Sequence, residues 1–141
     1  MRRILVTAAV LTAGFGLAPA TASADVSAAA ATCNSVKKIS LGNNYIRQPV
    51  NTNGAGRNCQ LSYGDSGSAV TALQQALKLC NYKANIAADG DFGEQTLKAL
   101  IYAQEKRGVD NDGIYGPITR GVLGWPAYNG NGFTGSCAKD V

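Results

Sequence analysis

Two short segments of this 141-residue chain bring carboxylates, glycines and hydroxyls together at the same spacing. The segment DGDFGEQTLKAL begins at Asp89, and DGIYGPITRGVL begins twenty-three residues later, at Asp112. Asp89 with Asp91, and Asp110 with Asp112, are the paired acids that a glycosidase would need across a cleft, one of them with a raised pKa. These acids stand beside glycines in turns, where solvent keeps them ionised, so we favour a turn-forming role over catalysis.

Other catalytic and cofactor chemistries lack the residues that they need. The chain has no histidine to act as the base for a serine nucleophile, and it has no G-x-S-x-G sequence. The acidic segments DGDFGE and DNDG depart from the spacing of a calcium loop. No glycine-rich phosphate loop is followed by Lys and Ser or Thr. We therefore expect no catalytic residue, no metal and no cofactor.

Each repeat is predicted to form a turn, to bury one aromatic residue and to start a helix. Asp-Gly favours a turn, because glycine adopts a positive φ cheaply and the aspartate accepts nearby amide hydrogens. The aromatic residue two positions later, Phe92 or Tyr115, is expected to plug the core. Gly93 is expected to precede a helix that begins at Glu94 and ends at the basic sequence Lys-Arg-Gly. Gly116 is expected to precede a shorter helix from Pro117 to Leu123.

Another helix is predicted before the repeats. Val70, Leu73, Leu77 and Cys80 form one apolar stripe at helical spacing, with Asp65 or Ser66 as the N-cap and an end at Asn81-Tyr82. Two glutamines follow apolar residues on the predicted helices, Gln74 and Gln104. We interpret each as a side-chain amide that ties down a loop backbone, rather than as a ligand contact.

The N-terminal part of the chain resembles an export signal followed by a small extension. Arg2 and Arg3, an apolar stretch and the sequence Ala-Ser-Ala ending at Ala24 predict a secretory signal peptide over residues 1–24. Residues 25–62 are predicted to form an extension with a weak β-hairpin around Gly42 and a flexible loop. Pro49 would confine the second strand of this hairpin to an edge.

The net charge bears on the class of binding partner, and the cysteine count bears on disulfide bonds. Without residues 1–24 the chain has 11 basic and 9 acidic residues, a net charge of +2, which is too weak to indicate a nucleic-acid partner. Four cysteines remain, Cys33, Cys59, Cys80 and Cys137, and an even number in a small exported chain predicts two disulfides, for which three pairings exist. We expect no membrane association after cleavage of the signal.

The order of these motifs resembles the first family of peptidoglycan-binding domains, modules found on bacterial cell-wall hydrolases. The motifs that carry the resemblance are GDSGSAVTALQQAL, DGDFGEQT and DGIYGPIT. The chain departs from the family at Ala103, where a bulky aromatic is usual. The resemblance implies a mainly α fold, a compact three-helix bundle over residues 63–126. The hairpin extension before it, a tail over residues 127–141 and the two disulfides complete the expected architecture.

The resemblance also implies a secreted, non-catalytic protein, outside the cell or on the wall, that binds the glycan strand or stem peptide of peptidoglycan, with a cell-wall enzyme as a further partner. The candidate ligand-binding residues carried over to this chain lie near the repeats: Asp89, Asp91, Thr96, Tyr102, Asp112, Thr119 and Arg120. From proximity in the sequence we hypothesise the pairings Cys33–Cys59 and Cys80–Cys137.

Two alternative functions remain at this point. One is a degenerate wall hydrolase or enzyme subunit in which the acids act. The other is a secreted inhibitor or protein-binding module that reuses the fold, with residues 25–62 as its basic contact surface.

Overall fold

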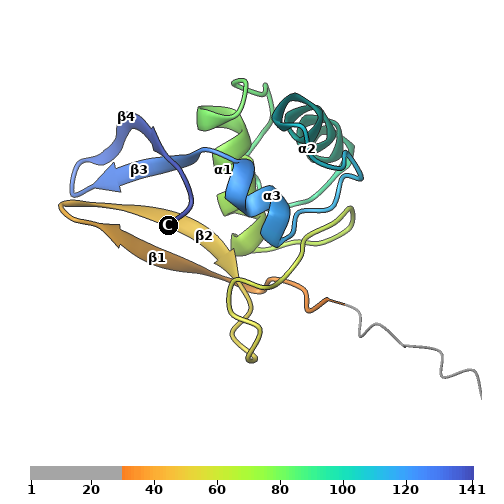
Figure 1. The fold of residues 1–141 in the computed structure, drawn as a ribbon, viewed down its shortest axis with the longest axis horizontal. Coiled ribbons are helices and arrows are strands. Elements are labelled where there is room, and N and C mark those ends of the chain that lie inside the picture. The colour runs from red at the N-terminus through yellow and green to blue at the C-terminus, as the bar shows by residue number, and fades with distance from the viewer. Residues whose placement is uncertain (1–29) are drawn as a thin grey trace, which may run out of the picture.

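The structure, a computed structural model, describes residues 30–141 (Figure 1). The elements in chain order are β1 (Ser35–Leu41), β2 (Asn44–Val50), α1 (Ser68–Cys80), α2 (Glu94–Arg107), α3 (Pro117–Val122), β3 (Trp125–Asn129) and β4 (Gly132–Ala138). The predicted signal peptide, residues 1–24, lies outside the described residues.

The strands form one four-stranded antiparallel sheet in the order β1-β2-β3-β4, and the helices lie on one side of it (Figure 1). The prediction of a mainly α three-helix bundle is therefore wrong. The segment expected to be a tail pairs as β4 with β3, and Asn129 and Gly132 close their hairpin. Pro126 in β3 and two glycines in β4 hide any alternating pattern in the sequence, so pairing with neighbouring strands decides this structure.

The N-terminal hairpin is present as predicted, with Leu41 opposite Asn44 across the turn. Gly42 takes a φ of 72°, a left-handed conformation that favours glycine. The prediction that Pro49 makes β2 an edge strand is wrong, since β2 lies between β1 and β3. The Cα pairing of β2 with β3 is confined to Tyr45 and Tyr128. Pro49 is far from that pair in the strand, so its missing amide removes no bond there.

Helix α1 is the central element, in contact with β1, β2, β3 and α2. Its predicted apolar stripe is confirmed, because Val70, Leu73 and Leu77 are fully buried. The N-cap is Gly67 and makes no side-chain cap, so the prediction of Asp65 or Ser66 at this position is wrong. Asp65 instead accepts a hydrogen bond from the Ser62 amide at 2.7 Å.

The two aromatic residues of the repeats are core plugs, as predicted. Phe92 and Tyr115 are buried, and the Tyr115 ring packs edge-on against Trp125 with centroids 6.1 Å apart. Ala103 is buried where the family usually has an aromatic residue, while Tyr102 beside it is exposed. Tyr102 therefore does not fill the core position.

Two disulfides fasten the parts of the chain outside the repeats. Cys33 bonds Cys59 and Cys80 bonds Cys137, which is the hypothesised pairing. The first bond joins the entry of β1 to the segment that leads into the helices. The second joins the end of α1 to β4 and so holds the C-terminal hairpin to the helical part.

The carboxylate of Asp140 forms a second fastening at the C-terminal end. It pairs with the Arg57 guanidinium at 2.7 Å and with that of Arg120, on α3, at 2.9 Å. The Gln48 amide donates to the same carboxylate at 2.9 Å. Burial raises the pKa of Asp140, but the Gln48 and Arg120 hydrogen bonds and both arginine charges outweigh it, so this pKa lies below its usual value.

Replacement of Asp140 by Asn should lower the free energy of unfolding by about 2 kcal/mol near neutral pH, because it weakens charge-assisted hydrogen bonds to two arginines. A carboxylate whose pKa is depressed in the folded state stabilises the fold above its unfolded pKa of about 3.9. That contribution is lost as the pH falls through the lower folded value. Urea denaturation should therefore show the deficit of the variant at about pH 7 and a smaller deficit at about pH 2.5.

The matched control is Glu105→Gln, because Glu105 is exposed and forms no ion pair within residues 30–141. It should change stability by less than about 0.5 kcal/mol. An Asp140→Asn protein as stable as the wild type near neutral pH would show that this carboxylate does not fasten the C-terminal segment.

Candidate functional site

A buried glutamine amide organises the turn of the first repeat. Gln74, on α1, donates from Nε2 to Asp89 Oδ1 at 3.0 Å, to the Asp91 carbonyl at 2.9 Å and to Thr96 Oγ1 at 3.0 Å. Its Oε1 accepts the Gly90 amide at 2.9 Å. The predicted role of Gln74 in tying down a loop backbone is confirmed.

Gln104, on α2, makes the same set of contacts with the second repeat. Its Nε2 donates to Asp112 Oδ1 at 3.1 Å, to the Ile114 carbonyl at 2.9 Å and to Thr119 Oγ1 at 3.0 Å. Its Oε1 accepts the Gly113 amide at 2.9 Å. Each helix therefore holds the turn that starts the next helix, and the repetition in the sequence is a repetition of this contact set.

Glycine is required in the second turn for two reasons. Gly113 has a φ of +71°, and a Cβ at this position would lie 2.4 Å from Leu97 Cδ1 and 3.2 Å from Ile101 Cγ1. A larger residue would strain the backbone, and the tip of the partly buried Leu97 side chain on α2 would have to move to make room for it.

The turn carboxylates are hydrogen-bond acceptors in Asx turns. Asp89 Oδ1 accepts the Asp91 amide at 3.0 Å, and Asp112 Oδ1 accepts the Ile114 amide at 2.9 Å. The Asp91 amide, and then the Gln74 side chain, lower the pKa of Asp89. A general acid would need the opposite shift, so this arrangement fits a structural carboxylate.

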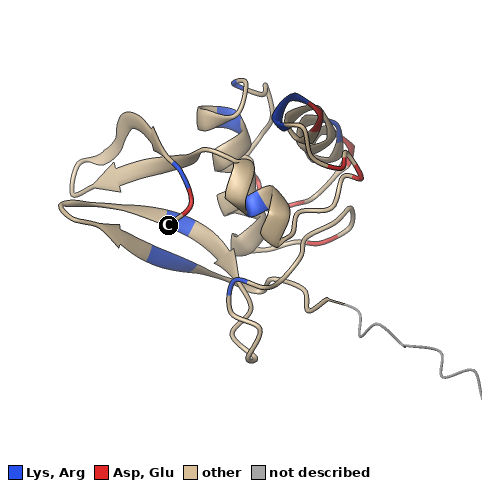
Figure 2. Cartoon of the chain, in the orientation of Figure 1, with Lys and Arg blue, Asp and Glu red and all other residues tan. Residues whose placement is uncertain are grey.

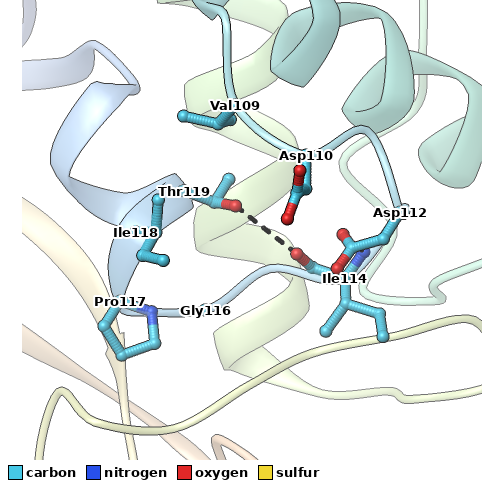
Figure 3. Close-up of a pocket in the computed structure, with 8 residues that line it drawn as sticks. All are labelled: Val109, Asp110, Asp112, Ile114, Gly116, Pro117, Ile118 and Thr119. Atoms are coloured by element: carbon cyan, nitrogen blue, oxygen red, sulfur yellow. Dashed lines mark hydrogen bonds between the residues drawn. The ribbon is translucent and has the colours of Figure 1, made fainter.

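A surface pocket lies beside each turn, at equivalent positions of the two repeats. The first, of about 330 Å³, is polar and is lined by Ala87, Asp89, Asp91, Gly93, Glu94, Gln95 and Thr96. The second, of about 160 Å³, is lined by Val109, Asp110, Asp112, Ile114, Gly116, Pro117, Ile118 and Thr119 (Figure 3).

The second pocket combines carboxylates with exposed aliphatic side chains. Ile118 and Ile114 are 75% and 39% exposed, while Figure 3 shows the side chains of Asp110 and Thr119 pointing into the same space. Asp112 uses Oδ1 for the Gln104 and Ile114 bonds, and its Oδ2 makes no hydrogen bond to residues 30–141. The pocket can therefore hold an aliphatic group next to a positively charged or amide donor.

Five of the seven residues predicted for the site lie at these two pockets, and two lie elsewhere. Tyr102 is half-exposed and packs edge-on against Tyr82, with ring centroids 5.5 Å apart. Arg120 is engaged by Asp140. Sequence reasoning missed Ile114 and Ile118, although their place inside the second repeat, where the first has Asp91 and Gln95, was a signal.

Within residues 30–141, no three His, Cys, Asp or Glu side chains are grouped closely enough to hold a metal ion. No helix in the same residues has both the length and the hydropathy that crossing a bilayer requires.

Comparison with protein families gives a match over residues 66–123, to the family described as "Putative peptidoglycan binding domain". The chain is 41% identical over 64 residues to a probable N-acetylmuramoyl-L-alanine amidase of Bacillus licheniformis, a match that covers 45% of this chain and 18% of the relative. It is 42% identical over 72 residues to an uncharacterised protein of Kitasatospora aureofaciens, covering 50% of this chain and 59% of that one. The chain thus spans about a fifth of the amidase.

Solved structures also match the chain. The N-terminal domain of SleB is 40% identical, with a TM-score of 0.42, and the match covers 45% of this chain and 85% of that domain. A peptidoglycan-binding protein of Clostridioides difficile, solved in complex with glutamine hydroxamate, is 28% identical, with a TM-score of 0.45, and the match covers 60% of this chain and 52% of that one.

Replacement of Gln104 by Met should destabilise the fold by about 2–3 kcal/mol, because it keeps the volume but leaves the buried Gly113 amide without its acceptor and the Ile114 carbonyl without this donor. The matched control is Gln95→Met, at an exposed position of the same helix. Chemical denaturation of both variants measures the difference. Equal stability of the two variants would contradict the structural role of Gln104.

Proposed function

We propose that this chain, whose residues 66–123 belong to the peptidoglycan-binding domain family, is a secreted, non-catalytic module that binds bacterial cell-wall peptidoglycan. The peptidoglycan-binding assignment of these residues rests on the family match. Secretion, the absence of catalysis and the positions of the contacts are our own extension of it.

The second-repeat pocket carries the proposal for where the wall is bound. An isoleucine as exposed as Ile118 loses contact with water when a ligand covers it, and this favours binding. Asp110 and Asp112 lie beside it and attract amino and amide donors. A short peptide that joins aliphatic side chains to amino and amide groups, such as the stem peptide of peptidoglycan, matches this combination.

The first-repeat pocket is proposed as a second, more polar contact. Asp89, Asp91 and Thr96 line it together with Glu94. Because Thr96 is buried and bonded to Gln74, the accessible polar groups are the carboxylates and the Gln95 amide. The carboxylates accept hydrogen bonds from sugar hydroxyls or peptide amides. Thr119 and Asp112 have the equivalent places in the second pocket.

Secretion is supported by the disulfides and by the sequence of residues 1–24. Disulfides persist in oxidising compartments outside the cytosol, and the four described cysteines are all bonded in pairs. We propose that residues 1–24 are removed on export, that residues 63–126 are the binding domain, and that residues 25–62 and 127–141 are its extensions.

Weak contacts suffice for this function. Peptidoglycan repeats its sugar and peptide units across a large surface, so a protein that releases one unit is close to the next. The two pockets are shallow, and neither needs a high affinity of its own for the protein to stay on the wall.

Replacement of Ile118 by Ser should weaken the binding of the purified protein to insoluble peptidoglycan roughly tenfold, because a contact worth about 1.4 kcal/mol is lost. Sedimentation over a range of wall concentrations measures the apparent affinity. Val141→Ser is the matched control, since Val141 is also an exposed aliphatic residue and lies outside both pockets. Wild-type protein that stays wholly in the supernatant would refute the proposed function.

Incubation of the wild-type protein with purified peptidoglycan should release no soluble sugar or peptide, because Asp89 and Asp112 serve as hydrogen-bond acceptors in their turns and the pKa of Asp89 is lowered, which is the opposite of what a general acid needs. Chromatography of the supernatant checks this. Release of fragments by the wild type, and not by folded Asp89→Asn and Asp112→Asn variants, would instead show an enzyme.

A further inference from the structure

A third surface groove, of about 360 Å³, lies between the β1–β2 hairpin and the N-terminal half of α1. The residues that line it and carry the argument are Val36, Lys38, Arg47, Ser68, Ala72 and Gln75. The hairpin that supplies its basic side chains lies outside the family match at residues 66–123. The groove is therefore a property of this chain's own extension packed on the shared domain.

The cations of the groove are held by aromatic rings. Tyr45 and Tyr128 stack with centroids 5.8 Å apart. The Arg47 guanidinium lies 5.6 Å from the Tyr45 centroid and 5.0 Å from that of Tyr128, and the Lys38 ammonium lies 4.7 Å from the Tyr45 centroid. Arg47 also donates to the Tyr45 hydroxyl at 3.3 Å. Cation–π contacts restrict both side chains, so a ligand has less motion to freeze.

Neither cation is neutralised by a carboxylate within residues 30–141, where the ion pairs involve Arg57, Lys98 and Arg120. Residues 35–50 contain no Asp or Glu, and Figure 2 shows the β1–β2 hairpin with blue segments and no red. The two positive charges therefore face solvent without a partner, and an anion would complement them.

Further hydrogen-bond donors converge on the same groove. Tyr128 donates its hydroxyl hydrogen to Gln75 Oε1 at 3.2 Å, which leaves the Nε2 hydrogens of Gln75 for a ligand. Burial is the main cause that raises the pKa of Tyr128, so this hydroxyl keeps its proton at neutral pH. Helix α1 adds partial positive charge, since its first turn has no acidic residue and no side-chain cap.

The remaining part of the groove is apolar and small. Val36 and Ala72 supply aliphatic surface beside the two cations. A ligand that fits both parts carries an oxyanion next to a small aliphatic side chain. The carboxyl-terminal end of a short alanine-containing peptide has this composition, whereas a bare phosphate would leave the apolar part uncovered.

We propose that this groove binds the terminal carboxylate of a short peptide, with Arg47 and Lys38 as its ionic contacts and Val36 and Ala72 against the adjacent methyl group. The identification of the wall as the source of that peptide rests on the proposed function, but the carboxylate site does not. The protein would then contact one polymer through acidic pockets on the turns and through a basic groove on the sheet.

Nuclear magnetic resonance titration of the purified full chain with acetyl-Ala-Ala tests the site. Backbone signals of Lys38, Arg47, Ser68 and Gln75 should shift with the free carboxylate and not with the matched C-terminal amide. The shifts should shrink at high salt, because ionic contacts are screened. Equal shifts with the amide, no shifts at all, or tighter binding of inorganic phosphate would each overturn the proposal.

Binding of the peptide carboxylate should weaken at least about tenfold in Arg47→Gln and in Lys38→Gln, because each variant loses one charge-assisted contact. Lys98→Gln, on the exposed face of α2, is the control and should leave the affinity for the peptide carboxylate unchanged. Lys38 is exposed, so its variant stays informative if Arg47→Gln fails to fold. Binding of the peptide by a protein that does not sediment with the wall would refute the proposed function and leave the groove intact.

Discussion

The buried carboxamide is the interaction on which the rest of this structure depends. A turn that reverses the chain inside a small domain exposes amide and carbonyl groups to the core, where an unpaired polar group is costly. Gln74 and Gln104 satisfy both kinds of group at once, accepting from a glycine amide and donating to a carbonyl, a carboxylate and a hydroxyl. Since each glutamine projects from one helix into the turn that starts the next, the two side chains link the three helices in series, in addition to the packing of the shared core.

These contacts explain why acidic residues accumulate on the turns, where their carboxylates accept backbone and glutamine hydrogen bonds. The oxygen atoms nearest the core are used by the backbone and by glutamine, and those on the outside face water. What differs between the repeats is therefore the surface: Asp91 and Gln95 in the first correspond to Ile114 and Ile118 in the second. The same turn therefore presents a polar pocket in the first repeat and an amphipathic pocket in the second. A polymer that repeats its units can contact both pockets.

The sheet adds a surface of opposite charge. Its C-terminal hairpin is attached to α1 by the Cys80–Cys137 disulfide, and the carboxylate of Asp140 joins α3 to the segment after β2. Arg120, one of the residues predicted to bind ligand, also makes this structural contact with Asp140. The β1–β2 hairpin packs directly against α1, and the basic groove lies between the two.

The sequence by itself determined the local structure of the repeats, because periodicity, Asp-Gly turns and glycine at helix starts act over a few residues. It also predicted the core roles of Phe92 and Tyr115 and the presence of two disulfides, whereas the pairing of the cysteines was a hypothesis that the structure confirmed. Tertiary structure alone decided that residues 127–141 complete a four-stranded sheet, because β4 has little apolar alternation and becomes a strand through its partners. It also decided the roles of Tyr102 and Arg120 and the position of the groove, since these depend on contacts between residues far apart in the chain, such as Arg120 with Asp140.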